Sequence, residues 1–175
     1  MSNIDRLSYA RQGKLFHAAN VSVKSVIAVN VAMTGLILYN PIGSGKKLAV
    51  VGVGFSWTTA PAAVHNLGIG VIAPEVAAPT SLTAAGSGVQ SADGSGARGI
   101  AAGYAYDAAT FVAAPVARKW LGGAAYGSGV GESPYAGSWD IDGEILVAAG
   151  GAACLIGLTT TLLGVGSVSW IEVDE

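Results

Sequence analysis

Residues 34–57, which read TGLILYNPIGSGKKLAVVGVGFSW, decide the fold. Two apolar runs, Leu36–Tyr39 and Leu48–Phe55, flank a polar, turn-rich centre. Pro41 fixes φ and lacks an N–H, and the two glycines of the centre permit positive φ, so the chain turns there instead of continuing a strand. The stretch predicts a β-hairpin with a long loop, in which the pair Lys46–Lys47 faces acidic residues of the C-terminal strands or of a neighbouring molecule.

The rest of the chain shows the same pattern of short apolar runs separated by Gly, Pro and Ser. Residues 21–26 alternate apolar and polar side chains, as a half-buried strand does, and run into three more apolar residues. The Ala-rich residues 105–110 suit either a strand or a helical turn, because Ala is the best helix former. Further strands are expected at residues 67–72, 139–147, 152–159 and 165–173, and residues 80–84, 101–106 and 110–119 also suit strands.

Eight or nine short strands, with no long amphipathic helix and no β-α-β alternation, predict an all-β fold. The expected architecture is an antiparallel β-sandwich of jelly-roll-like type. Residues 1–20 show no clean period and are expected to form an N-terminal arm, ordered only where it docks on something. Residues 21–175 are expected to form a single β-sandwich domain, with long Gly/Ser-rich loops at 73–100 and 122–137. Within the first loop, residues 86–96 are a candidate contact tip.

The composition is that of a protein with little charge to solvate its surface. Hydrophobic residues make up 51% of the chain and charged residues 11%, against roughly 25% in ordinary soluble domains. Such a surface is either buried against partners or covered by small residues. The mean hydropathy of +0.53 invites a membrane interpretation. The uncharged stretches, however, are interrupted by Gly, Pro and Thr and lack the span of about 20 apolar residues that a membrane helix needs. The start of the chain shows no signal-peptide pattern.

Charge is distributed unevenly along the chain. Residues 1–47 carry six Lys and Arg against one Asp, whereas residues 140–175 carry six acidic residues and no Lys or Arg. This asymmetry is typical of pairing between neighbouring strands, or of complementary faces on adjacent subunits. The net charge of −2 argues against nucleic acid as a partner, because nucleic-acid binding needs a concentrated basic footprint.

Motifs for nucleotide and metal binding are weak. The segment Gly43–Lys47 lacks the first glycine and the Ser/Thr of a phosphate-binding loop and leads into a β-run, so a turn is the better interpretation. His17 and His65 have no Cys, Asp or Glu at metal-ligand spacing. Cys154 is the single cysteine and is expected to be a small buried residue in a strand.

Three acids alternate in one predicted strand, at Asp140, Asp142 and Glu144. They would project from one face, where paired carboxylates could serve glycoside hydrolysis or hold calcium weakly. A solvated or cation-facing edge that discourages strand pairing is the simpler interpretation. The four tryptophans could line a sugar site, but their spread over four segments favours core or subunit-interface positions: Trp57, Trp120, Trp139 and Trp170.

The chain resembles structural proteins of tailed-bacteriophage virions. The resemblance rests on LYNPIGSGKKLAVVGVG followed by TTAPAA, on DGEILV at residues 142–147 before a Gly-Gly turn, and on the ending VSWIEV at residues 168–173. It covers roughly residues 21–72 and 138–175. Proteins of this appearance include small β-sandwich capsid decoration (cement) proteins. The resemblance implies assembly on the major capsid protein, association into a homotrimer, and location on the capsid surface of a virion assembled in the host cytoplasm.

The expectation is therefore a non-enzymatic virion structural protein that binds and stabilises the outer surface of a phage capsid. No catalytic, cofactor-binding or metal-binding residues are assigned, no cofactor is expected, and neither nucleic acid nor membrane is expected as a partner. Two alternatives remain. One is a tail- or fibre-associated virion protein that binds host glycan through the loops at 73–100 and 122–137. The other is a small carbohydrate-active enzyme that uses Asp140, Asp142 or Glu144.

Overall fold

The computed structural model describes residues 5–58, 65–75, 77–85, 89–91, 100–124, 136–158 and 162–175. Regular structure in these ranges is almost entirely β. It comprises one helix, α1 (Arg6–Arg11), and the strands β1 (Leu15–Ala19), β2 (Lys24–Val26), β3 (Ala32–Tyr39), β4 (Lys46–Trp57), β5 (His65–Ile72), β6 (Thr80–Ala84), β7 (Gln90–Ser91), β8 (Tyr104–Thr110), β9 (Val116–Ala124), β10 (Ala136–Val147), β11 (Ala152–Gly157) and β12 (Leu162–Asp174).

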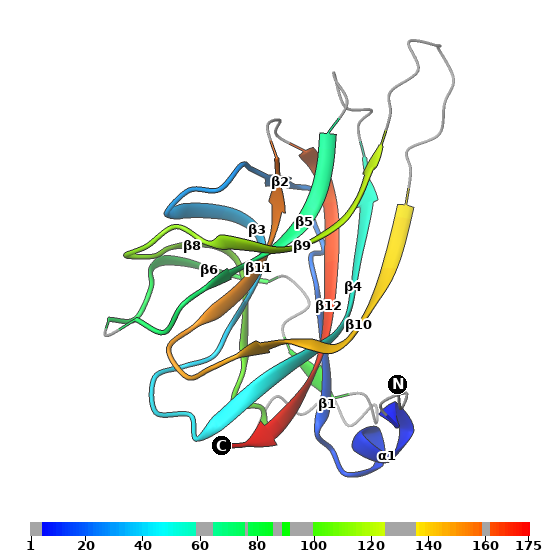
Figure 1. Ribbon diagram of the computed structural model, residues 1–175, viewed down its shortest axis with the longest axis vertical. Coiled ribbons are helices and arrows are strands. Elements are labelled where there is room, and N and C mark those ends of the chain that lie inside the picture. Colours follow the sequence, from blue (N-terminus) through cyan, green and yellow to red (C-terminus); the bar gives the residue numbers. More distant parts are fainter. Residues whose placement is uncertain are drawn as a thin grey trace.

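The strands form two antiparallel sheets that pack face to face (Figure 1). Sheet A has the order β10-β4-β12-β1-β7, with β2 also paired to β12, and sheet B has the order β6-β8-β3-β11-β5-β9. The chain alternates between the sheets. It passes from β3 in sheet B to β4 in sheet A and back to β5 in sheet B. Later it passes from β9 in sheet B to β10 in sheet A, to β11 in sheet B and to β12 in sheet A. The two packed antiparallel sheets confirm the predicted all-β sandwich.

The hairpin predicted at residues 34–57 is wrong, although both of its strands exist. β3 pairs with β8 and β11 in sheet B, whereas β4 pairs with β10 and β12 in sheet A. The connection between them therefore passes from one sheet to the other. Asn40 explains the change of direction: it is fully buried, and its side-chain Nδ2 donates to the carbonyls of Lys46, at 2.7 Å, and Val147, at 2.9 Å.

The expected arm at residues 1–20 also needs correction. Residues 15–19 form β1, which pairs with β12 along its whole length, and Phe16 is buried in the main core, where its ring stacks on Trp170. Residues 6–11 form α1, with Asp5 as its N-cap. The sequence lacked a clear period here because a six-residue helix and a five-residue strand are each too short to show one.

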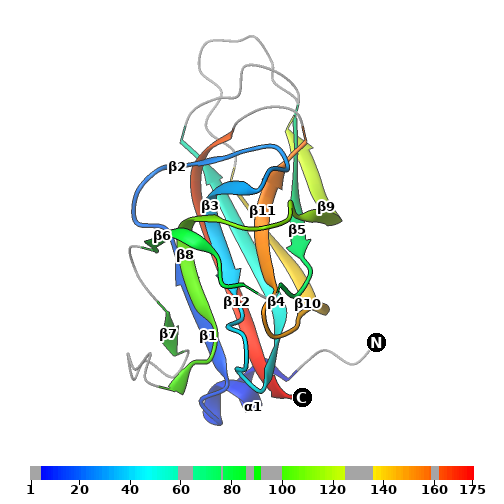
Figure 2. The same ribbon diagram turned by 90° about the vertical axis from the view of Figure 1, so that its left-hand side faces the viewer.

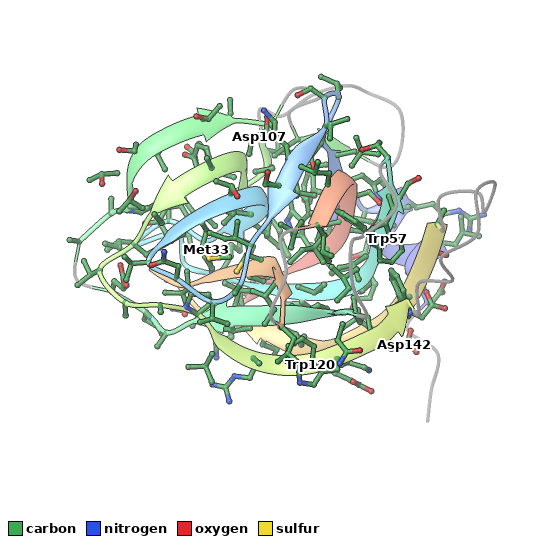
Figure 3. The ribbon with its side chains drawn as sticks, turned by 90° about the horizontal axis from the view of Figure 1, so that it is seen from above. Met33, Trp57, Asp107, Trp120 and Asp142 are labelled. Carbon is green, nitrogen blue, oxygen red and sulfur yellow. The ribbon has the colours of Figure 1, made fainter. Side chains whose placement is uncertain are left out.

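The main core lies between the two sheets and follows the alternation of their strands. Sheet A contributes inward side chains such as Val53 and Trp170, and sheet B contributes Leu38, Ile69 and Leu155. Trp57 also lies in this core, at 4% exposure, so two of the four tryptophans are core residues as predicted. Figure 3 shows Trp57 among side chains of the sandwich interior.

A second apolar cluster lies on the outer face of sheet B. It includes Ile37, Ile72 and Ile156, each almost completely buried. The connection from β8 to β9 covers it, because this segment must cross β3, β11 and β5 to reach the far edge of the sheet (Figure 2). The connection from β5 to β6 crosses in the opposite direction. Glu75 in the second connection accepts hydrogen bonds from the N–H groups of residues 112 and 113 in the first, at 3.1 and 2.7 Å, and holds the two together.

Two buried carboxylates tie further segments to the sandwich. Glu172 on β12 accepts hydrogen bonds from the N–H groups of Ala102 and Gly103, at 2.8 and 2.9 Å, just before β8. Asp107 on β8 (Figure 3) accepts a hydrogen bond from Asn20, which follows β1, and forms an ion pair at 3.2 Å with Lys24 at the start of β2. Both carboxylates are satisfied by partners, as buried charge requires.

Several strand limits differ from those expected. β2 has three residues, fewer than the alternation at 21–26 suggested, and residues 104–110 form β8, so the helical turn considered at 105–110 is absent. The expected contact tip at 86–96 and the loop at 122–137 lie largely outside the described residues. In the described parts, residues 90 and 91 form β7 beside β1, β9 extends to residue 124, and β10 begins at residue 136.

Replacing Asn40 by Ala should destabilise the fold by about 2–4 kcal/mol, because two buried carbonyls would lose their donor. Denaturant unfolding measures this. Asn30→Ala, at an exposed position, is the matched control and should cost less than about 1 kcal/mol. Equal effects of the two substitutions would show that the buried amide does not stabilise the crossing between sheets.

The Cys154 thiol should resist thiol reagents in the folded protein. It is 4% exposed in a central strand, and burial raises its pKa to about 12, so almost no thiolate forms at pH 8. We expect Ellman's reagent to react only as denaturant unfolds the chain. Rapid reaction of the native protein would contradict the central position of β11.

Candidate interaction surface

The outer face of sheet A carries a patch of mostly small side chains. We call this patch the open face. Its residues alternate with inward core residues and align across four strands in three rows. All are exposed or half-buried. From β10 to β1, the rows are Ala136, Ser56 and Val165; Ser138, Gly54, Ser167 and Ala19; and Asp140, Gly52, Ser169 and His17.

The open face is nearly neutral. Its one formal charge is Asp140, at the end nearest α1. A shallow groove of about 430 Å³ lies on it, lined by small residues such as Ser56, Ser138 and Ser167. Gly, Ala and Ser lose little side-chain entropy when they are covered, so burying such a face costs little conformational free energy.

Of the two glycines of the open face, Gly52 is not explained by packing within the described residues. Gly in a strand interior weakens the strand, and it often marks close approach of another backbone. A Cβ at Gly52 would meet only the Trp139 carbonyl oxygen, at an ordinary 3.7 Å. A Cβ at Gly54 would crowd the Ser167 hydroxyl, at 2.6 Å, which can rotate away. The described residues therefore do not require glycine at position 52.

His17 sits at one border of the open face and stays neutral there. Its Nδ1 lies 2.7 Å from the Ser169 hydroxyl. Burial lowers the pKa of His17, because the charged imidazolium is less well solvated beside the sheet. At neutral pH the imidazole therefore adds no charge to the face.

Helix α1 covers the adjoining part of sheet A. Tyr9 and Ala10 pack on a small outer cluster formed by Leu15, Ala49, Val51 and Ile171. Val51 is the extra residue of a β-bulge, because Gly52 and Val50 pair with the consecutive residues Ser169 and Trp170 of β12. Arg6 donates to the Val51 carbonyl at 2.8 Å, so the helix also satisfies a backbone group beside the irregularity.

Arg6 gathers two of the three alternating acids. Its guanidinium contacts Asp140 at 2.7 Å and Asp142 at 3.2 Å, and the hydrogen bond to Asp140 is the main cause of the raised pKa of Arg6. Positive φ angles at Asp142 (51°) and Gly143 (76°) break the alternation that the sequence suggested. This pair of carboxylates is therefore a cation-facing edge, one of the interpretations that the sequence offered.

Glu144 faces a different cation. It forms an ion pair with Lys119 on β9, which belongs to the other sheet. The three acids thus divide between two basic partners, one from α1 and one from sheet B. The predicted pairing of Lys46–Lys47 with C-terminal acids is confirmed for Lys46, whose ammonium binds Asp174. That contact raises the pKa of Lys46 and lowers the pKa of Asp174.

Other candidate sites are limited in the ranges that the structure covers. There, no group of three or more His, Cys, Asp and Glu side chains could hold a metal ion. No helix in those ranges is long and apolar enough to cross a membrane. The side chain of His65 lies outside the described residues. The sequence did not reveal the open face, because its Gly and Ser residues become one surface only when β4 and β12 pair.

Comparison with known proteins gives no relative for this chain: no family model, no curated protein and no solved structure matches it.

Proposed function

We propose that this protein is a non-enzymatic decoration protein that binds the outer surface of a phage capsid through the open face and stabilises the shell. The observation that supports this proposal best is the contrast between the two outer faces. The face of sheet B is covered by the chain's own crossing segments, whereas no other described segment covers the middle of sheet A, which is nearly uncharged. The virion setting comes from the sequence resemblance.

The chemistry of the open face suits protein–protein packing. Its strands are hydrogen-bonded to one another, so covering the face removes few unpaired polar groups from water. Two flat surfaces of small residues approach closely, and dispersion contacts then accumulate over the whole area. In this proposal the protein forms a homotrimer, and three copies of the face bind neighbouring copies of the major capsid protein. Each contact can be modest, because linked contacts multiply in strength.

The arrangement of acids supports a structural role over hydrolysis. Asp140 and Asp142 share Arg6, and Glu144 is paired with Lys119. An inverting or retaining glycosidase instead needs two carboxylates facing one bond, one of them with a raised pKa. The three ion pairs are surface contacts that fasten α1 and sheet B to the edge strand β10.

A negative charge on the open face should prevent attachment without unfolding the protein. Ser138→Glu and Ser167→Glu each place a carboxylate in the central row, where docking would bury it unpaired. We expect capsid affinity to fall at least tenfold, because burying an unpaired charge costs several kcal/mol. Particles from a phage that lacks the gene are mixed with purified protein, and the bound fraction is measured by sedimentation. Thr83→Glu, exposed on β6 of the other sheet, is the matched control and should bind normally.

Electron microscopy of the same particles locates the protein. Density on the capsid faces, contacted through β4, β10 and β12, is the expected result. Density confined to the tail would overturn the decoration role in favour of a tail-associated protein. Normal attachment by both serine variants would overturn the assignment of the open face as the contact surface.

Mild acid should weaken the folded protein through His17. Its pKa is lowered on folding from an unfolded value of about 6.5, so the folded state binds fewer protons. Stability should therefore fall as the pH drops below about 6.5 through the lower folded pKa. His17→Gln removes this titration while all other groups remain, so the variant should lose less stability than wild type between pH 7.5 and pH 5, measured by denaturant unfolding. Identical losses would show that His17 does not contribute.

A further inference from the structure

A groove lies between the edge strands β9 and β10, which are on the same side of the sandwich (Figures 1 and 2). β9 is the last strand of sheet B and β10 the last strand of sheet A, so each has one side without a neighbouring strand among the described residues. The groove has a volume of about 460 Å³, in the range of binding sites. Its lining combines aliphatic and charged side chains: Val71, Arg118, Lys119, Glu144, Ile145 and Leu146.

The buried part of this lining is apolar and continuous with the main core. Ile145 is 6% exposed and belongs to that core, and Val71 packs against it. Leu146, the next residue of β10, is 55% exposed. A single exposed leucine is ordinary, but this one lies in the same concave site as Val71 and Ile145. Aliphatic side chains of an occupant would therefore be removed from water in the groove.

The charges of the groove are not balanced. Lys119 and Glu144 form an ion pair that spans it from one sheet to the other. Arg118 is the extra residue of a β-bulge, because Lys119 and Ala117 pair with consecutive residues of β5, and such bulges often redirect a side chain. Arg118 is exposed, and no carboxylate of the described residues lies within ion-pair distance of it. The groove therefore favours an occupant that brings a carboxylate.

The backbone edge of β9 also has hydrogen-bonding groups to offer. Among the described residues, the backbone–backbone hydrogen bonds of residues 116–121 are those of the pairing with β5. An edge strand presents unpaired N–H and C=O groups on its other side, to which an extended chain can add. The charges select the strand: β10 carries Asp140, Asp142 and Glu144, which repel an acidic chain, whereas β9 carries Arg118 and Lys119.

The outer face of β9 is separate from this groove. Trp120 lies there, 44% exposed, with its ring over Gly68, where a Cβ would come within 2.7 and 3.0 Å of two ring carbons (Figure 3). Trp120 does not line the groove, and neither does any other described aromatic residue. Recognition in the groove therefore depends on aliphatic contacts, the Arg118 guanidinium and the backbone of β9.

From these observations we propose that the edge of β9 binds an extended acidic peptide segment of a partner protein as an added strand. The peptide main chain pairs with the backbone of β9. Because side chains alternate along an extended chain, its aliphatic residues cover Val71, Ile145 and Leu146, and an acidic residue between them pairs with Arg118. This site is on the sandwich edge, away from the open face, so the proposal goes beyond the proposed function and does not depend on it.

The test uses the full chain and three peptides. The probe is acetyl-Thr-Val-Glu-Val-Thr-amide, and its neutral match has Gln in place of Glu. The third peptide is the probe with N-methyl groups on Glu and on the following Val, which blocks one N–H on each edge of the extended chain. We expect the probe to shift the amide resonances of residues 116–121 in NMR spectra and to bind about fivefold more tightly than the Gln peptide, as a partly exposed ion pair allows. The N-methylated peptide should not bind, because it cannot pair as a strand.

Substitutions at Arg118 test the charge directly. Arg118→Gln should weaken binding of the probe about fivefold and leave the affinity of the Gln peptide unchanged. Arg118→Glu should reverse the preference, so that acetyl-Thr-Val-Lys-Val-Thr-amide binds more tightly than the probe. Because Arg118 is exposed, neither change disturbs the core. Arg11→Gln, exposed on α1, is the matched control and should bind the probe as wild type does.

Four results would overturn the proposal. Equal affinity for the probe and the Gln peptide, or unchanged binding of the probe by Arg118→Gln, would remove the role of the guanidinium. Equal binding of the N-methylated peptide would exclude strand addition. Dimerisation of the peptide-free protein in sedimentation experiments, lost in Arg118→Glu, would assign the edge of β9 to another copy of the chain instead.

Discussion

The hydrogen bonds of Asn40 hold together the corner on which the two-sheet arrangement depends. Its backbone N–H donates to the Gly151 carbonyl at 2.9 Å, and its own carbonyl accepts from the Gly150 N–H at 2.8 Å. Its side chain reaches the carbonyls of Lys46 and Val147. Two separate passages between the sheets, from β3 to β4 and from β10 to β11, are thereby joined at one residue. Because β4 pairs with β10 and β3 with β11, this corner sets the relative position of the central strands of both sheets.

The asymmetry of the outer faces follows from this topology. Sheet B must connect strands at its opposite edges, so two segments cross its outer face and bury a second apolar cluster beneath them. Sheet A has no such crossing among the described residues, and α1 covers only its lower part. The remaining area can stay bare because its residues are small and uncharged. The low charge of the sequence is thus reflected in the small, uncharged residues on the exposed part of sheet A.

Local patterns in the sequence predicted the strands well and their partners poorly. The apolar runs on both sides of Asn40 are strands, and Cys154, Trp57 and Trp170 are buried as expected. The pairing failed because a turn-rich centre of six to eight residues looks the same whether it closes a hairpin or passes between sheets. What distinguishes the two is the burial of Asn40 against Val147, a contact across more than one hundred residues. β1 was missed because a strand of five residues is too short to show a clear period.

The surface features were harder to predict than the core. Arg6 and the acids at 140 and 142 are far apart in sequence, and nothing local connects them. Gly68 and Trp120 likewise become a unit only when β5 and β9 pair. The Gly and Ser residues at positions 52, 54, 167 and 169 form a face only because β4 and β12 lie side by side. Alternation within each strand hinted at two faces, but the neighbour that makes each face continuous is a tertiary property.

The end of β12 and helix α1 lie at the same pole of the sandwich (Figures 1 and 2). The Glu172 N–H donates to the Lys14 carbonyl, so the chain just before its C-terminus is fastened to the segment that follows the helix. A peptide or domain fused after Glu175 would therefore project from this pole, away from the middle of sheet A and from the crossing segments on sheet B. The fold thus offers a point of attachment for cargo that leaves both broad faces unobstructed.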